Sequence, residues 1–230
     1  MATKPKARRL TPVSRATPSS EEGPRVDGRH RRRMQTEEKL LAATAALLSE
    51  GGIAAVGVNA VSERADVEKV LVYRYFGGVE GLMEAYALRA DFWPSLAELI
   101  GEKGEVLAGP DKARAGAKAL SNYAAALRKR PVTLDLLAWE CSHRNPLISV
   151  LEKVREERST ELIEALTRAG VVRSRDVGQV GTLFAAAINY LTVRGRDIRI
   201  FGGIGVRTES DWQHIEDLMT RVFALMMTSD

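Results

Sequence analysis

Two glycine pairs divide the first third of the chain into blocks that are too short to fold alone. In the blocks at residues 36–50 and 68–76, apolar residues recur every three or four positions, and Gly51-Gly52 and Gly77-Gly78 follow them directly. Such spacing places apolar side chains on one face of a helix, and glycine commonly follows a helix end. The segment is therefore expected to hold short helices that pack on one another.

Three helices are expected in this segment, at Thr36–Glu50, Val58–Ala65 and Glu68–Tyr75, with a fourth beginning near Val79. A tight turn at Asp66 joins the second helix to the third. Two short helices joined in this way are typical of a helix-turn-helix motif, whose second helix enters the major groove of DNA. The inward side chains are expected to be Val67, Val72 and Phe76.

The remaining chain predicts more helices and almost no strand, because aromatics make up only 6% of the residues and no long stretch alternates apolar with polar residues. We expect an all-α protein with a three-helix head at residues 34–80 and a larger helical body at residues 81–230. The body helices are expected at 95–103, 111–129, 131–143, 146–169, 176–199 and 209–228, with Gly202-Gly203 as a flexible connection.

The net charge of +4 hides an uneven distribution. Residues 1–33 hold ten Lys or Arg against three acids, a net charge of +7, so the other 197 residues carry 24 minus 27, or −3. A proline-interrupted basic segment of this kind predicts a disordered arm that seeks phosphate, although a membrane surface or an acidic partner would suit the same charge. Translation from Met34 would remove this arm.

Several other classes of protein do not fit. Cys141 is the only cysteine, which excludes an intrachain disulfide, favours a cytoplasmic location and is expected to be a small buried residue. The uncharged run at 177–193 is expected to be a buried helix, with no membrane span. The three histidines are scattered, and the glycines at 202–205 lack the spacing of a phosphate-binding loop. We expect no catalytic activity, no metal and no cofactor.

Seventeen positions between residues 40 and 82 share the spacing of a known family. They are Leu40, Leu41, Ala42, Ala43, Leu47, Leu48, Glu50, Gly52, Val58, Val61, Ala65, Val67, Tyr73, Tyr75, Phe76, Glu80 and Leu82. In these positions the segment resembles the DNA-binding domain of the TetR family of transcriptional regulators. The resemblance implies a dimeric regulator, most simply a repressor that a small-molecule effector releases from its double-stranded DNA operator.

The resemblance and the outer face of the third helix together predict the DNA-contacting residues. Tyr73 and Tyr75 match family positions that donate a hydroxyl to phosphates, and Arg74 suits the edge of a guanine. Arginines just before the first helix can reach a minor groove or a flanking phosphate. The full predicted set is Arg29, Arg31, Arg32, Arg33, Asn59, Lys69, Val70, Leu71, Tyr73, Arg74 and Tyr75.

Four residues depart from the family pattern, three of them at positions that usually approach phosphate. Gly57 replaces a capping Ser or Thr, Glu68 replaces a common Ser or Thr, and Val79 replaces a Lys. The carboxylate of Glu68 would repel DNA unless Arg64 or Lys69 pairs with it. Asp66 replaces a turn glycine. The alternative function is therefore a ligand-binding or partner-binding protein whose head binds DNA weakly or not at all.

The body is expected to hold a dimer interface on its last two helices and an effector site among its aromatic residues. The predicted interface residues are Val177, Val180, Gly181, Phe184, Ile188, Leu218, Val222 and Met226. The predicted ligand-binding residues are Trp93, Tyr123, Trp139, Glu140, His143 and Phe184. An intrachain core is the competing interpretation of both sets.

Overall fold

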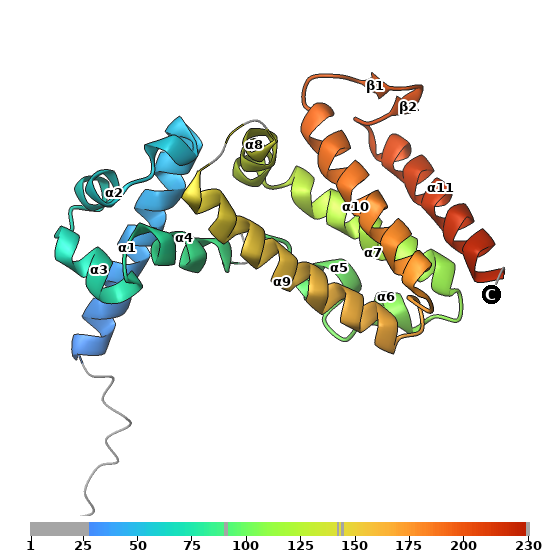
Figure 1. Ribbon diagram of the computed structural model, residues 1–230, viewed down its shortest axis with the longest axis horizontal. Helices are drawn as coiled ribbons and strands as arrows, with labels where there is room; N and C mark the ends of the chain where they lie inside the picture. Colours follow the sequence, from blue (N-terminus) through green and yellow to red (C-terminus); the bar gives the residue numbers. More distant parts are fainter. Residues whose placement is uncertain (1–27, 90–91, 142, 144, 229–230) are drawn as a thin grey trace, which may run out of the picture.

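A computed structural model describes residues 28–89, 92–141, 143 and 145–228 of the chain, which are almost entirely helical (Figure 1). The elements are α1 (Gly28–Gly51), a 3-10 turn (Ile53–Ala55), α2 (Val58–Ala65), α3 (Lys69–Phe76), α4 (Val79–Ala87), α5 (Leu96–Ile100), α6 (Glu105–Ala108), α7 (Lys112–Arg128), α8 (Pro131–Glu140), α9 (Pro146–Arg168), α10 (Arg175–Arg194), β1 (Ile200–Phe201), β2 (Ile204–Gly205) and α11 (Glu209–Thr228). The prediction of an all-α fold is confirmed.

The head packs α1, α2 and α3 around three side chains that are completely buried: Leu40, Val61 and Val72. Asp66 ends α2 in the left-handed conformation, with φ 53° and ψ 52°, as expected for a residue that replaces a turn glycine. Val67 packs against the core in the angle between α2 and α3. These contacts hold α3 at the edge of the head.

Helix α1 begins at Gly28, eight residues before the predicted start at Thr36. The extra turns are supported by side chains at helical spacing: Arg33 Nε donates to Glu37 Oε1 at 2.7 Å, and Thr36 Oγ1 donates to the Arg32 carbonyl at 2.9 Å. Residues 28–33 of the predicted disordered arm are thus helical, and residues 1–27 lie outside the described residues.

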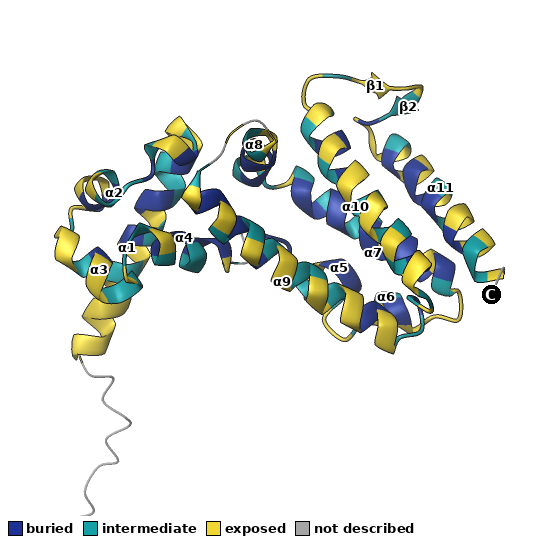
Figure 2. Cartoon of the chain, viewed as in Figure 1, coloured by how far each residue is buried: buried dark blue, intermediate teal, exposed yellow. Residues whose placement is uncertain are grey.

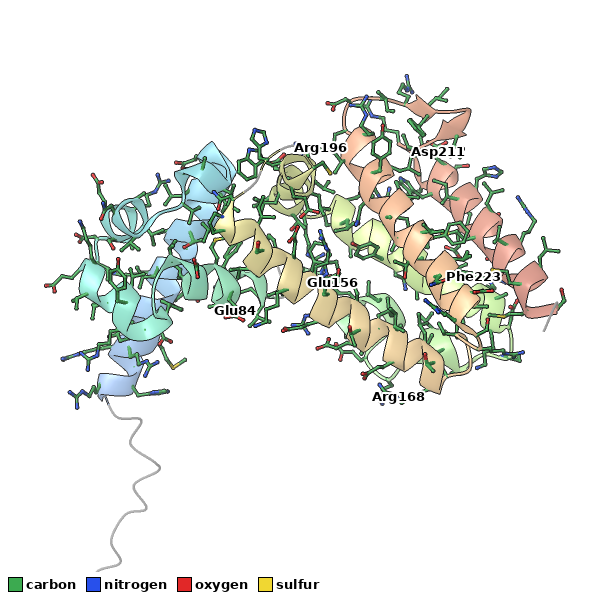
Figure 3. All side chains as sticks on the ribbon, in the orientation of Figure 1. Glu84, Glu156, Arg168, Arg196, Asp211 and Phe223 are labelled. Carbon is green, nitrogen blue, oxygen red and sulfur yellow. The ribbon has the colours of Figure 1, made fainter. Side chains whose placement is uncertain are left out.

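Helix α4 joins the head to the body. Leu82 and Met83 are completely buried, and beyond the helix end Arg89 Nη1 donates to both carboxylate oxygens of Glu38 on α1 at 3.1 Å. On its other side α4 meets the first half of α9, where Lys153 Nζ lies 3.2 Å from Glu84 Oε1 (Figure 3). The predicted boundary at residue 80 therefore runs through a helix that packs on both parts.

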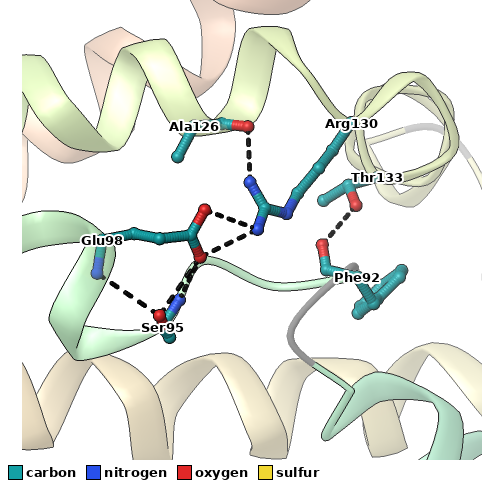
Figure 4. Close-up of polar contacts among 6 residues, drawn as sticks. All are labelled: Phe92, Ser95, Glu98, Ala126, Arg130 and Thr133. Atoms are coloured by element: carbon teal, nitrogen blue, oxygen red, sulfur yellow. Dashed lines mark hydrogen bonds and ion pairs between the residues drawn. The ribbon is translucent and has the colours of Figure 1, made fainter.

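The segment that follows α4 is tied to the body by polar contacts (Figure 4). Arg130 Nη2 donates to both carboxylate oxygens of Glu98 at 2.8 and 2.9 Å, while Ser95 and Glu98 form a capping box at the start of α5. The Thr133 hydroxyl donates to the Phe92 carbonyl at 2.5 Å. These bonds hold residues 92–100 against the junction of α7 and α8.

Helix α7 lies at the centre of the body, with α11, α10 and α5 packed around it (Figure 1). Alanines and a glycine line its buried faces and allow close approach. A Cβ added at Gly116 would lie 3.0 Å from a methyl group of Val171. At the end of α8, Cys141 is exposed and its thiol donates to the Leu137 carbonyl, so the prediction that it would be buried is wrong.

Helix α10 ends at Arg194, five residues before its predicted end, and the chain then forms a hairpin. Ile200 pairs with Gly205 and Phe201 pairs with Ile204 in antiparallel register, while Gly202 and Gly203 take positive φ angles in the turn between them. The flexible connection expected here is thus an ordered two-residue turn. After the hairpin, Asp211 accepts hydrogen bonds from the backbone N–H groups of Arg207 and Thr208 and so stabilises the start of α11 (Figure 3).

The uncharged run at 177–193 lies within α10, one side of which packs in the helical body. Within the described part of the chain, no helix has the length and apolar character needed to cross a membrane.

Candidate nucleic-acid interface and ligand cavity

The outer face of α3 is solvent-exposed as its sequence predicts. Lys69, Val70, Tyr73 and Arg74 are exposed, while Val72 on the opposite face is completely buried. A short helix with one buried face and one free face of mixed apolar, aromatic and basic residues has the form needed to enter a major groove. Of the other predicted residues in the motif, Asn59 on α2 is exposed and Leu71 and Tyr75 are half-buried.

A basic hollow of about 360 Å³ lies between the start of α1 and the end of α3. It is lined by Arg29, His30, Arg33, Arg74 and Tyr75, and we call this set the basic hollow. The Arg33 guanidinium lies 5.2 Å from the centre of the Tyr75 ring, close enough for a cation–π interaction. The hydrogen bond and the charge of Glu37 raise the pKa of Arg33, so that side chain stays protonated.

The hollow separates the predicted arginines into two groups. Arg29 and Arg33 are four residues apart on α1 and both line it, whereas Arg31 and Arg32 are exposed on α1 but do not. His30 was not predicted. A helix predicted to continue through residues 28–33 would have indicated it, because residues three or four positions apart, such as His30 and Arg33, share a helix face. Convergent cations with aromatic support can hold a phosphate oxygen.

Two departures from the family pattern have visible consequences in the motif. Gly57 caps α2 without any side-chain hydrogen bond. Glu68 is exposed at the start of α3, and among the described residues it forms no ion pair, because Arg64 pairs with Glu50 on α1 instead. The compensation of Glu68 by Arg64 that the sequence allowed is therefore absent.

A cavity of about 370 Å³ opens in the body, between α7, α9 and α10. Three of the six predicted ligand-binding residues line it, namely Trp93, Tyr123 and Glu140. Its other walls are largely apolar, with Leu120, Leu166 and Phe223 among them. Its volume falls within the range of small-molecule sites.

The other three predicted ligand-binding residues do not line the cavity. Trp139 stacks on the exposed His143 ring with centroids 4.5 Å apart and planes 2° from parallel. Phe184 makes an edge contact with Phe223, which lines the cavity, and the centres of the two rings are 5.5 Å apart. These three predicted residues therefore lie outside the cavity lining, which other residues form.

The cavity has one polar wall, which the sequence only partly indicated. The Tyr123 hydroxyl donates to Asn189 Oδ1 at 2.7 Å, and Arg155 on α9 forms an ion pair with Glu140 at the end of α8. Burial raises the pKa of the Tyr123 phenol far above its usual value, so this group stays neutral. Asn189 and Arg155 were missed because each belongs to a long helix whose polar residues mostly face solvent.

Three of the eight predicted dimer residues lie in the interior of the single chain, four are half-buried and one is exposed. Val177 and Ile188 are 2% and 1% exposed and Gly181 lines the cavity, so these three belong to the interior of the body. Val180, Phe184, Leu218 and Met226 are half-buried, and Val222 is 37% exposed. Because α10 is apolar nearly all round, its sequence did not separate the inward face from the outward one.

Both α10 and α11 have exposed residues along one side (Figure 2), and several of these are large and apolar. Leu183 is 68% exposed and Tyr190, seven residues along α10, is 50% exposed; Val222 and Leu225 lie on the exposed side of α11. Phe201 of the hairpin extends this surface by an edge contact with Tyr190 at 5.2 Å. We call these five residues the apolar stripe.

Comparisons with known proteins agree with this arrangement. The model of the family "Bacterial regulatory proteins, tetR family" matches residues 40–86, which run from the core of α1 to α4. A search of curated proteins found no match.

Solved structures share the fold of both parts. A protein from Rhodococcus sp. described as a TetR-family transcriptional regulator is 20% identical, with a TM-score of 0.59 over 83% of this chain and 99% of its own. A TetR-like transcriptional regulator from Rhodococcus sp. RHA1 is 18% identical, with a TM-score of 0.51 over 82% of this chain and 96% of its own. Residues 40–86 therefore carry the helix-turn-helix domain of the tetR family of bacterial regulatory proteins, and the described chain shares the fold of solved structures described as TetR-family regulators.

Proposed function

We propose that the chain is a homodimeric repressor that leaves its operator when a small molecule fills the body cavity. The observation that carries this proposal is the basic hollow, which sets Arg29 and Arg33 of α1 beside Arg74 of α3. A phosphate held there would fix the depth and angle at which α3 enters the groove. The sequence alone suggested a guanine contact for Arg74, but its place in the hollow favours a phosphate contact.

Dimerisation is supported by the apolar stripe on α10, α11 and the hairpin. Exposed large apolar side chains on adjacent elements favour association, and a twofold axis through this surface would use the same patch on both chains. Two heads are needed to read two half-sites on one face of DNA, about 34 to 36 Å apart. Leu183, Tyr190 and Val222 are the residues that we place in the interface.

Release by an effector is supported by the course of α9, which runs from the head to the far end of the body (Figure 1). Its first half packs on α4, with Lys153 paired to Glu84, and Arg155 only two residues later lines the cavity. A ligand that moves α9 would therefore act on α4 and on the head. A coupling free energy of about 1 to 3 kcal/mol is sufficient for regulation.

Selection of bound fragments from genomic DNA tests the proposal. The repressor should retain a small set of fragments, with binding that weakens steeply as salt rises. Small molecules that the products of the neighbouring genes act on should then release the fragment and raise the melting temperature. A folded dimer that retains no fragment at low salt would contradict DNA-dependent repression.

The alternative function is a ligand-binding protein whose head binds DNA weakly. It is favoured by the exposed carboxylate of Glu68 at the start of α3, which forms no ion pair with any described residue, and by the missing cap hydroxyl at Gly57. In that case the fragment selection would fail, while ligands would still stabilise the body. The basic hollow is the reason that we place repression first.

A further inference from the structure

We propose that the body cavity selects an electrically neutral, mainly apolar molecule that carries one hydrogen-bonding oxygen, such as an alcohol, ester or ketone. This inference rests on the proposed effector site and names the chemistry of its ligand. It follows from how charges and hydrogen-bonding groups are arranged on the cavity wall.

The charged residues of the wall already cancel one another. Two arginines and two glutamates line the cavity, Arg155 and Arg158 with Glu140 and Glu156, so their formal charges sum to zero. Arg155 and Glu140 pair directly, with side chains only 22% and 20% exposed. Arg158 forms an ion pair with Glu161 at 2.9 Å, and Glu156 is exposed to solvent along α9 (Figure 3).

A charged ligand would disturb this balance at a high cost. A carboxylate beside Arg155 would meet the charge of Glu140 at the same guanidinium, and the site with its ligand would carry a net charge of −1. An ammonium group would leave a net charge of +1. Uncompensated charge in a partly buried site is strongly unfavourable, whereas a neutral polar group has no such cost when it is hydrogen-bonded.

The hydrogen-bonding groups on the polar wall favour an oxygen acceptor on the ligand. Tyr123 donates to Asn189 Oδ1, which leaves the amide Nδ2 of Asn189 as a donor. No acceptor for that amide is found among the described residues, and Asn189 lines the cavity. A carbonyl or hydroxyl oxygen of a ligand could accept this hydrogen bond, while the ligand's apolar part lies against Leu120, Leu166 and Phe223.

Matched probes test the inference on the full-length protein. We would measure binding by calorimetry for 1-decanol, decanoate and decylamine, and for 4-phenyl-1-butanol, 4-phenylbutanoate and 4-phenylbutylamine, all below their aggregation limits. The two sets differ in shape, and within each set only the polar group changes. The alcohols should bind at least tenfold more tightly than the acids and the amines. Equal or tighter binding of an acid or an amine, or no binding of either alcohol, would overturn the inference.

Charge-removing variants provide a sharper test because they should change the preference in opposite directions. Glu140→Gln leaves Arg155 unbalanced, so decanoate should bind at least tenfold more tightly than to the wild type. Arg155→Gln leaves Glu140 unbalanced and should favour decylamine. The double variant should restore the preference for 1-decanol. An unchanged preference in both folded single variants would show that this pair does not set the ligand class.

These outcomes are separate from those that test repression. Binding is measured without DNA, so the alcohols can bind to a protein that no ligand releases from its operator. That result would contradict the release mechanism and leave the ligand class supported. Release of DNA by an unrelated charged molecule at this cavity would contradict the ligand class alone.

Discussion

The head and the body are both helical, but their functional surfaces arise in different ways. In the head, the exposed residues of α3 are oriented by a completely buried residue of the same short helix, Val72. In the body, the cavity wall joins residues that are far apart in sequence, such as Tyr123 and Asn189. Local periodicity can therefore identify the first surface, and only tertiary packing assembles the second.

The largest expected effect is the loss of dimerisation. The double variant Leu183→Arg with Val222→Arg places charge in the apolar stripe and should give a folded monomer. Operator affinity should fall by about 10² to 10⁴, because the second head no longer binds at the high effective concentration set by the first. Sedimentation and fluorescence anisotropy measure the two effects. Thr167→Arg, on the exposed side of α9, is the control and should stay dimeric. A double variant that stays dimeric would remove the stripe from the account, and a monomer that keeps full affinity would contradict the need for two heads.

The basic hollow predicts that arginines on one helix differ in importance. Arg33→Gln should weaken DNA binding about tenfold or more. It should also make the slope of log affinity against log salt shallower by roughly 0.9 for each phosphate that is no longer neutralised, or about 2 per dimer. Arg31→Gln removes the same charge outside the hollow and is the matched control. Equal effects of the two variants would mean that only the total charge of α1 matters.

Arg74 separates phosphate binding from base recognition. In the hollow it should bind phosphate, so Arg74→Ala should weaken binding to all sequences by a similar factor of about tenfold, as Tyr73→Phe should to a smaller extent. Binding to a library of operator variants measures this. A changed preference at one base pair would instead support the guanine contact that the sequence suggested.

Glu68 is expected to oppose DNA binding, and its removal should increase affinity. Glu68→Gln removes a negative charge at the start of α3 and should raise affinity by about two- to fivefold at low salt, with a smaller gain at high salt because exposed charges are screened. Gly57→Ser should add a further small gain through a helix cap and a hydroxyl. Glu63→Gln, an exposed residue of α2, is the control. Lower affinity of Glu68→Gln would assign the carboxylate a positive role in recognition.

The smallest expected effect concerns the connection between the two regions. Lys153→Gln removes the ion pair between α9 and α4, whose partners are 65% and 43% exposed. Such pairs contribute about 0.2 to 1 kcal/mol, so the ratio of operator affinities with and without effector should shrink by less than about fivefold. Glu157→Gln removes another possible partner of Lys153 without touching α4 and should leave the ratio unchanged. A complete loss of the response would show that this single pair carries the coupling.

Much of the head could be predicted from sequence, because its constraints are local. The left-handed Asp66, the buried Val72 and the exposed Tyr73 all follow from turn chemistry and helical spacing. The start of α1 could not be placed, since Arg29 to Arg33 are compatible with both a disordered arm and a helix. The basic hollow brings the start of α1 next to Arg74, about 40 positions later in the chain, and helical spacing cannot predict which distant segments meet.

The sequence predicted the helices of the body but not which face of each helix is buried. Helix bounds at 146–168 and 209–228 agree within a residue with the predictions, because proline and capping signals are local. The apolar character of α10 on nearly all sides left its orientation open, so Val177 and Ile188 were assigned to a surface that Leu183 and Tyr190 occupy. Glu140 was predicted as a ligand-binding residue without its partner Arg155, which only the packing of α9 on α8 reveals.

The most direct test of the account is a salt titration of the wild-type chain on a selected genomic fragment, with the mass of the complex measured at each step. We expect two chains, or a multiple of two, on each fragment and affinity that falls steeply and linearly on a log–log plot. We also expect Arg33→Gln to flatten that line while Arg31→Gln leaves it nearly unchanged. A folded, dimeric protein that shifts no fragment even at low salt would contradict the central claim.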